Sequence, residues 1–211
     1  MIPGIDLIDF IKYVGVLGVV LVIFAESGLL IGFFLPGDSL LFTAGFLTQA
    51  GFLPINIHLL VLFVFVAAVL GDSVGYAFGK KVGSRVFTRK NSLLFRQENI
   101  LKAQSFYEKH GAITIVIARF IPIVRTFAPV VAGVANMKYK TFLSFNLIGA
   151  FLWAAGVTYL GYFVGKWFKQ AGIDIDTVLI PIVLLIIFFS VLPPAIHILK
   201  DKKQRDALWD G

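Results

Sequence analysis

The chain alternates long apolar blocks with short polar segments, and the length of the blocks predicts membrane-spanning helices. A helix needs about 20 mostly apolar residues to cross a bilayer. Residues 57–78 and 178–199 meet this length without interruption, and residues 142–164 come close to it. We therefore predict three spanning helices in an all-α, polytopic membrane protein. The composition agrees, because 58% of the residues are hydrophobic, against roughly 45–50% in soluble domains.

A further apolar block, residues 15–53, is too long for one span and is broken in its middle. Pro36 and Gly37 interrupt it, and the acidic residues Glu26 and Asp38 lie on either side of the interruption. Proline removes a backbone donor and clashes with the preceding helical turn. Broken backbone at membrane depth is tolerated only where protein surrounds it or where it lines a cavity. We predict a re-entrant hairpin that turns at Pro36 and Gly37 and leaves by the face through which it entered.

A second broken block covers residues 111–137. It contains Pro122 and Pro129, and it places Arg119 and Arg125 among apolar residues. The same argument predicts a second re-entrant hairpin, with its tight turn at Pro122 and a second break at Pro129.

The two broken blocks belong to an internal repeat. Three stretches match in the same order: residues 18–26 with 111–119, residues 44–45 with 132–133, and residues 75–80 with 161–166. Each repeat is one hairpin plus one spanning helix, covering about residues 14–80 and 111–166 of a single membrane domain. One full crossing per repeat inverts the second copy, as in many secondary transporters. An extra spanning helix at about 177–199 follows.

The distribution of basic residues predicts the orientation. The connector at 80–110 and the tail that begins at Lys200 are rich in Lys and Arg, and basic loops of this kind are cytoplasmic. The first hairpin then enters from outside and the second from the cytoplasm. Binding of anionic head groups by the connector is the weaker interpretation of its charge. Residues 1–13 have the pattern of a short amphipathic helix, which we interpret as an interfacial anchor rather than a signal peptide.

Composition excludes several classes of function. The chain has no Cys, so disulfides, thiol catalysis and Cys-ligated metals are excluded. His58, His110 and His197 are isolated near the predicted span ends, and we expect neither a metal nor a cofactor. The net charge of +7 is explained by the basic loops, without a nucleic-acid partner. The hairpins contain no nucleophile–base pair, so we do not expect an enzyme.

The candidate site consists of the charges inside the two hairpins. Each charge at the centre of a membrane helix costs about 2.5–3.5 kcal/mol or more. Glu26 and Asp38 lie on the first hairpin and Arg119 and Arg125 on the second, so opposed hairpin tips would bring acids and arginines together near the midplane. Arginine suits phosphate because its planar fork donates two parallel hydrogen bonds. A phosphate that took an arginine from its carboxylate would favour protonation of that carboxylate, which gives a route to proton coupling.

Two interpretations stay open at this stage. Asp72, in a spanning helix, is either a proton relay or a residue that caps or pairs near the interface. The four hairpin charges could also be ion pairs that only hold the hairpins together, although buried pairs are weak evidence for stability. Asn146 and Trp153 are interpreted as interhelical hydrogen bonding and packing.

In combination these motifs resemble the bacterial DedA family, whose domain is also called VTT or SNARE-associated. The resemblance covers about residues 15–166 and rests on Glu26, Phe34–Leu41, Ala44-Gly45, Gly71-Asp72, Gly75-Tyr76, Arg119–Arg125, Pro129, Ala132-Gly133, Phe145-Asn146, Gly149 and Trp153. It implies re-entrant hairpins in a bacterial inner membrane, lipid translocation such as recycling of undecaprenyl phosphate, maintenance of the proton motive force and resistance to cationic peptides. The family's essential acids match Glu26 and Asp38, and its essential arginines match Arg119 and Arg125.

The leading functional prediction is a proton-linked flippase for an anionic lipid, with the polyprenyl phosphate undecaprenyl phosphate as the expected substrate. In it Arg119 and Arg125 hold the phosphate, and Glu26, Asp38 and Asp72 handle protons. The alternatives are a phospholipid scramblase, a proton-coupled exporter of small cations or drugs, a lipid phosphatase and a non-transporting assembly factor. The lipid, the direction and ion coupling of transport, and a homo-oligomeric state are not specified by the sequence.

Overall fold

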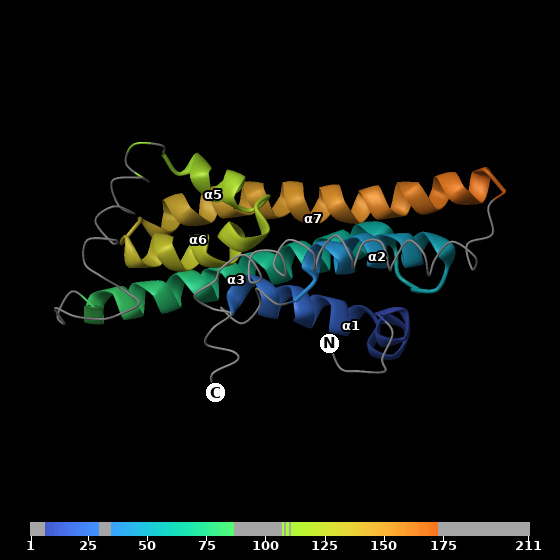
Figure 1. Ribbon diagram of the computed structural model, residues 1–211, viewed down its shortest axis with the longest axis horizontal. Coiled ribbons are helices and arrows are strands. Elements are labelled where there is room, and N and C mark those ends of the chain that lie inside the picture. Colours follow the sequence, from blue (N-terminus) through green and yellow to red (C-terminus); the bar gives the residue numbers. More distant parts are fainter. Residues whose placement is uncertain (1–6, 30–34, 87–106, 108, 110, 173–211) are drawn as a thin grey trace, which may run out of the picture.

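The computed structural model describes residues 7–29, 35–86, 107, 109 and 111–172 of the chain (Figure 1). This part is α-helical and contains no strand. Its helices are α1 (Leu7–Gly28), α2 (Gly37–Ala50), α3 (Ile57–Val86), α5 (Ile113–Ala118), α6 (Pro122–Val134) and α7 (Tyr139–Gln170). The predicted C-terminal spanning helix at 177–199 and most of the connector at 80–110 lie outside the described residues.

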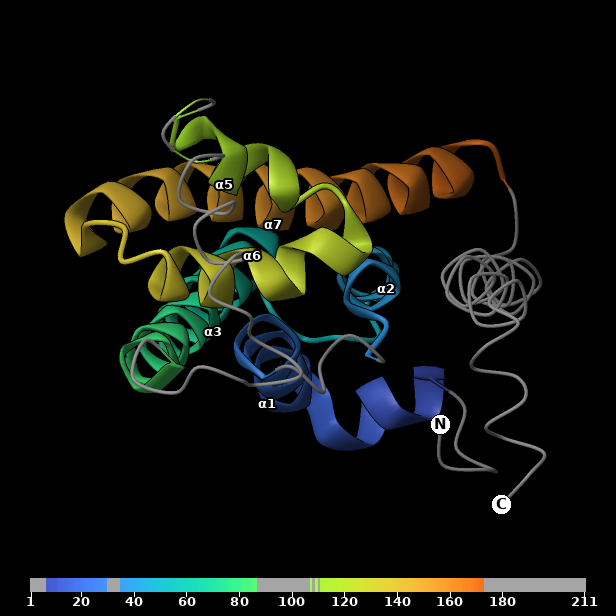
Figure 2. The same cartoon turned by 60° about the vertical axis from the view of Figure 1, so that its left-hand side comes forward.

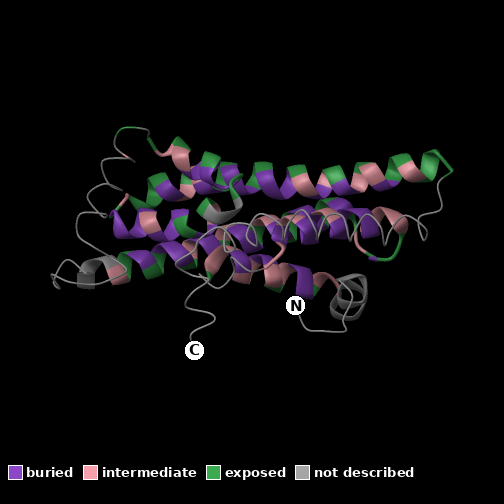
Figure 3. Cartoon of the chain, in the orientation of Figure 1, coloured by how far each residue is buried: buried purple, intermediate pink, exposed green. Residues whose placement is uncertain are grey.

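Two of these helices, α3 and α7, are long and apolar enough to cross a membrane. The qualifying stretches, Ile57–Val82 and Tyr139–Gln170, contain the spans predicted at 57–78 and 142–164. Large apolar side chains are exposed along both helices, among them Leu70 on α3 and Leu160 on α7, and exposed residues follow their outer edges in Figure 3. An outward face of this composition suits lipid better than water.

The N-terminal helix changes direction at Gly15. This residue has φ 62° and ψ −157°, a backbone conformation that glycine adopts without steric penalty. The bend divides α1 into a short piece, residues 7–14, and a longer piece that reaches Gly28. A separate short N-terminal helix was predicted for residues 1–13, and the part of it from Leu7 onward is helical; residues 1–6 lie outside the described part.

The first broken block is a pair of helices, α1 and α2. Pro36 is the residue that precedes α2, and Gly37 and Asp38 open its first turn, where the positive end of the helix dipole favours an acid. The helix ends at Gly51, whose φ of 83° lets its N–H donate back to the carbonyl groups of Leu47 and Thr48. Pro36 and Gly37 therefore lie at the end of the connection between the two helices, as the sequence indicates.

The second broken block is also a pair of helices, α5 and α6. The helical path is interrupted after Ala118, and Ile121 is extended, with φ −111° and ψ 108°. Pro122 is the first residue of α6, a position at which its missing N–H costs nothing. The second break predicted at Pro129 was wrong, because α6 continues through this residue. Proline's fixed φ is compatible with a helix, and neighbouring helices compensate the one lost hydrogen bond in membrane proteins.

The two helix pairs approach the middle of the molecule from opposite ends (Figure 1). α1 and α5 each run toward the middle, and α2 and α6 each run back from it, while α3 and α7 extend along most of the long axis in opposite directions. α2 packs along α7, and α6 packs along α3; Figure 2 gives the same neighbours from a second direction. The second helix of each pair is therefore packed against the long helix of the other half.

Glycine makes both of these crossings close. A Cβ atom on Gly45 of α2 would lie 2.0 Å from the carbonyl oxygen of Thr158 in α7. A Cβ atom on Gly133 of α6 would lie 2.1 Å from the carbonyl oxygen of Tyr76 in α3. The repeat aligns Gly45 with Gly133, and the two residues have equivalent roles. The crossings are thus backbone against backbone, as is common between helices in membranes.

Candidate functional site

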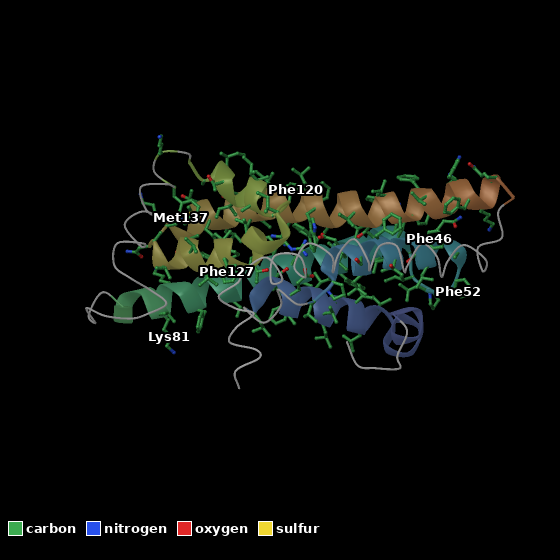
Figure 4. All side chains as sticks on the ribbon, in the orientation of Figure 1. Phe46, Phe52, Lys81, Phe120, Phe127 and Met137 are labelled. Carbon is green, nitrogen blue, oxygen red and sulfur yellow. The ribbon has the colours of Figure 1, made fainter. Side chains whose placement is uncertain are left out.

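Charged side chains gather where the two helix pairs meet. Each charged residue comes from a different element, and all but Asp72 lie near a helix end or a break between helices. The charged residues are Glu26 of α1, Asp38 of α2, Asp72 of α3, Arg119 after α5 and Arg125 of α6, and Asn146 and Trp153 of α7 lie beside them. Figure 4 shows side-chain nitrogen and oxygen atoms in the middle of the molecule, surrounded by carbon. We call these seven residues the central cluster.

Arg125 joins the two helix pairs directly. Its Nη1 donates to Asp38 Oδ1 at 2.6 Å, and its Nη2 donates to Glu26 Oε1. The Arg125 side chain is 13% exposed and that of Glu26 is 3% exposed, whereas the Asp38 side chain is 41% exposed. One guanidinium thus holds two carboxylates, and the Asp38 carboxylate is the more accessible of the two.

Arg119 has a different set of partners. Its Nη1 donates to Asp72 Oδ2 and, at 2.9 Å, to Asn146 Oδ1. The Arg119 and Asp72 side chains are each 6% exposed. Asn146 is itself oriented by a bond from its Nδ2 to the Val69 carbonyl oxygen, at 3.4 Å. This second ion pair is therefore shielded and braced by two long helices.

Trp153 touches both ion-paired groups. Its Nε1–H donates to Asp38 Oδ1 at 2.6 Å. The guanidinium carbons of Arg125 and Arg119 lie 4.9 and 5.2 Å from its ring, within the range of cation–π attraction. Trp153 is buried, so its ring and its N–H contact the charged groups away from solvent.

Two polar atoms of the central cluster have no hydrogen-bond partner among the described residues. They are Glu26 Oε2 and Arg119 Nε, and both are buried. Leaving a buried polar group unsatisfied costs about 1–3 kcal/mol, and more for a charged one. The Glu26 carboxylate is further confined by Gly37, since a Cβ atom on that glycine would lie 1.5 Å from Glu26 Oε2. Residue 37 therefore has to be glycine for lack of space beside the carboxylate.

The sequence prediction was right about one arginine and wrong about the partner of the other. Glu26 and Asp38 are both bonded to Arg125, so the expected meeting of acids from the first helix pair with an arginine of the second is confirmed. Arg119 was expected to neutralise the same two acids, but it pairs with Asp72. The packing of α3 against α6 places Asp72 beside Arg119, level with the meeting point of the two helix pairs. The roles given to these residues in phosphate binding and proton transfer stay predictions.

The contribution of α7 to the cluster was predicted only in part. Asn146 was expected to hydrogen-bond between helices, and its bond to the Val69 carbonyl oxygen of α3 confirms this. Trp153 was interpreted as packing, and neither residue was linked to the charges. A signal was present: Asn146, Gly149 and Trp153 are spaced to share one face of a helix. Gly149 lets α5 approach that face, with its Cβ position 3.2 Å from Val116 Cα and 3.6 Å from Arg119 Cδ. The spacing of the polar residues along α7 could therefore have predicted that they contact Arg119.

Within the described part of the chain, no group of three or more His, Asp or Glu residues could hold a metal ion. His58 is occupied in a bond of 2.6 Å between its Nδ1 and the hydroxyl of Tyr159, at the far end of α3 from the connector. His110 and His197 lie outside the described residues.

Comparisons with known proteins agree with the sequence motifs. The model of the VTT domain family matches residues 35–163. Protein DedA of Escherichia coli (strain K12) is 43% identical over 183 residues, which is 87% of this chain and 81% of DedA. An uncharacterized membrane protein of Mycobacterium leprae (strain TN) is 44% identical over 176 residues, 83% of this chain and 75% of that protein.

A more distant match is the inner membrane protein YqjA of Escherichia coli (strain K12), 37% identical over 146 residues, which cover 69% of this chain and 65% of YqjA. No solved structure matches the chain. The range matched by the VTT domain contains every charged residue of the central cluster except Glu26.

Proposed function

This chain belongs to the DedA family of VTT-domain membrane proteins, and we propose that it carries an anionic lipid across the bacterial inner membrane, with undecaprenyl phosphate as the leading substrate. Its phosphate would bind at Arg125 and Arg119. Glu26, Asp38 and Asp72 would exchange protons as the arginines change partners. The relative YqjA is an inner membrane protein, which supports the location.

The proposal includes a topology. α1–α2 and α5–α6 would be re-entrant hairpins of an inverted repeat, and α3 and α7 would be the spanning helices, with the connector at 80–110 and the C-terminus in the cytoplasm. Two features support it: the helix pairs point at each other from opposite ends of the long axis, and equivalent glycines form the two crossings. The hairpin tips, with their charges, would then lie near mid-depth, where transporters of this architecture bind substrate.

One observation carries the proposal: Arg125 is held at the meeting point by two carboxylates rather than one. A guanidinium offers two parallel donors that fit carboxylate and phosphate equally well. A phosphate monoester could therefore replace the two carboxylate oxygens without loss of hydrogen bonds to Arg125. The accessible Asp38 carboxylate, 41% exposed, is the group that such a phosphate would displace first.

Arg119 would supply a further donor once the phosphate is in place. Its buried Nε has no acceptor among the described residues, and an unsatisfied donor on a cation favours an anionic partner. Its bonds to Asp72 and Asn146 are both made by Nη1, so the Nε–H can donate to a ligand oxygen.

The surface beside the arginines fits a lipid tail. Phe120 follows Arg119 and is 56% exposed, and Val124 precedes Arg125 and is 42% exposed. Figure 4 labels Phe120 and Phe127 on the α5–α6 pair. Apolar surface so near the cations would let a hydrocarbon chain stay in the bilayer while its phosphate reaches the central cluster.

Transport in proteoliposomes tests the proposal. Purified protein is reconstituted, a polyprenyl monophosphate is added to one leaflet, and its appearance in the other leaflet is followed. Wild-type protein and the control Lys140→Ala, which removes an exposed charge at the start of α7, should transport at equal rates. Arg125→Ala should reduce the rate at least tenfold. Equal rates for empty and protein-containing liposomes would remove the proposal.

A second candidate function is proton-coupled export of small cations or drugs. It is favoured by the surplus of acid in the central cluster, where three carboxylates face two guanidiniums, and by the accessibility of Asp38. Flux of a cationic dye against a pH gradient, in liposomes without any polyprenyl phosphate, would support this function over lipid transport.

A further inference from the structure

The acids of the central cluster are not equivalent when Arg125 changes partner. This follows from which hydrogen bonds each carboxylate keeps. The argument rests on the proposed function, in that it assumes a phosphate taking the place of the carboxylates on Arg125.

Asp38 keeps a donor after the exchange. Its Oδ1 accepts from Arg125 Nη1 and from Trp153 Nε1, each at 2.6 Å. When Arg125 binds a phosphate instead of Asp38, the indole N–H of Trp153 stays bonded to Oδ1. Trp153 is buried in α7, whereas Arg125 belongs to α6, so a movement of Arg125 does not displace the indole. The Asp38 side chain is also 41% exposed. Asp38 can thus remain ionised.

Glu26 is left without a cation. Its Oε1 accepts from Arg125 Nη2, and its Oε2 has no partner among the described residues. Its side chain is only 3% exposed, and Gly37 closes the space beside Oε2. An ionised carboxylate stripped of its cation in such a place is far more costly than a neutral one. Loss of Arg125 therefore obliges Glu26 to bind a proton.

Other charged groups around Glu26 do not relieve this demand. The elements packed against α1 contribute Asp38 from α2, Asp72 from α3 and Arg125 from α6. Arg119, reached through Asp72, is bonded to that acid. The two nearby acids add negative charge, and Arg125 is the one cation bonded to Glu26 in the described part of the chain.

We propose that Glu26 is the residue that takes up the proton when a lipid phosphate binds Arg125, and that Trp153 is a positioning residue that keeps Asp38 ionised through the exchange. The step is balanced: the Arg125–carboxylate bonds are replaced by Arg125–phosphate bonds, and one proton from the aqueous phase joins the Glu26 carboxylate. The added proton offsets one unit of negative charge, so the net charge of the site falls by one unit less than the charge of the bound phosphate.

Proton uptake on binding measures this assignment. A polyprenyl monophosphate in detergent micelles is titrated into the full-length protein, and binding heats in buffers of different ionisation enthalpy give the number of protons bound. We expect about one proton more for wild type than for Glu26→Gln, a difference that cancels any proton bound by the phosphate itself. Asp38→Asn should bind as many protons as wild type.

Trp153 is tested in the same titration. Trp153→Phe keeps an aromatic ring beneath the guanidiniums but loses the N–H, so Asp38 should also become protonated and proton uptake should exceed that of wild type. The affinity for the polyprenyl monophosphate should fall about tenfold or more, because the bound state would lack the Trp153–Asp38 hydrogen bond, and a hydrogen bond to a charged group is usually worth this much. Trp167→Phe, an exposed tryptophan on the same helix, is the matched control and should behave as wild type.

These measurements test the roles of Glu26 and Trp153 separately from the proposed function. Binding by wild type with equal proton uptake in Glu26→Gln would overturn the role of Glu26. Unchanged uptake and affinity in Trp153→Phe would overturn the role of Trp153. Absence of any binding to wild type would remove the proposed function, and the inference with it.

Discussion

Neutralising Asp72 should destabilise the protein severely, because it would leave a buried guanidinium without its counter-charge. In Asp72→Asn, Arg119 would retain the Asn146 carbonyl oxygen, 2.9 Å away, as a neutral acceptor. Arg119 and Asp72 are each 6% exposed in their side chains, so water cannot replace the carboxylate. Removing one member of a buried ion pair costs about 3–5 kcal/mol, and we expect a loss of unfolding free energy in this range.

The double variant Asp72→Asn/Arg119→Gln separates lost attraction from stranded charge. Replacing a whole buried pair by neutral groups is often close to neutral in stability, so the double variant should recover most of the loss. The coupling energy of the double-mutant cycle should be at least about 2 kcal/mol. Lys140→Gln, which changes an exposed residue, should alter stability by less than about 0.5 kcal/mol.

Equilibrium unfolding in mixed micelles, followed by circular dichroism, provides the four free energies of the cycle. A loss below about 1 kcal/mol for Asp72→Asn would be the behaviour of an exposed pair, and would mean that water reaches Arg119. A double variant as unstable as Asp72→Asn alone would mean that the stranded charge is not the cause of the instability.

Three further predictions concern packing, hydrogen bonding and metals. Gly45→Ala should lower the unfolding free energy by about 1–3 kcal/mol, because its Cβ atom would lie 2.0 Å from Thr158 O. Gly156→Ala, with open space around it, should be neutral or stabilising in the same equilibrium unfolding assay, and equal stabilities of the two variants would contradict the prediction. Asn146→Leu should cost about 1–3 kcal/mol by removing an acceptor of Arg119, measured by the same unfolding assay and contradicted by an unchanged melting temperature. Chelators should leave transport in proteoliposomes unaltered, since no described cluster suits a metal; inhibition reversed by added metal would contradict this.

Sequence reasoning recovered the helices because membrane spans are set by length and apolarity, which can be counted directly. It located the breaks at Pro36 and Pro122 because proline before a helix has a simple steric cause. It failed at Pro129, where the cost of one missing hydrogen bond is met by packing of α6 on α3, and tertiary contacts of this kind leave no local mark in the sequence.

The partners of the arginines were harder to predict than their presence. Charges in apolar blocks are conspicuous, so Glu26, Asp38, Arg119 and Arg125 were identified from pattern alone. Which acid meets which arginine depends on the register of two helix crossings. The repeat alignment paired Gly75 with Gly161. The Cβ position of Gly161 lies 2.0 Å from the Phe42 carbonyl oxygen, but the glycine of α3 with an equally close contact is Gly79, one turn after Gly75, whose Cβ position lies 2.0 Å from the Val130 carbonyl oxygen.

The central claim is that the two helix pairs enter the membrane from opposite faces and meet at the charged residues. The chain has no native Cys, so single-cysteine variants labelled with a membrane-impermeant thiol reagent in right-side-out and inverted vesicles report the face of each site. Cysteines at Phe52 and Ala171 should be labelled from outside, and cysteines at Lys109 and Lys138 from the cytoplasmic side. Labelling of the Phe52 and Lys138 positions from the same face would contradict the claim.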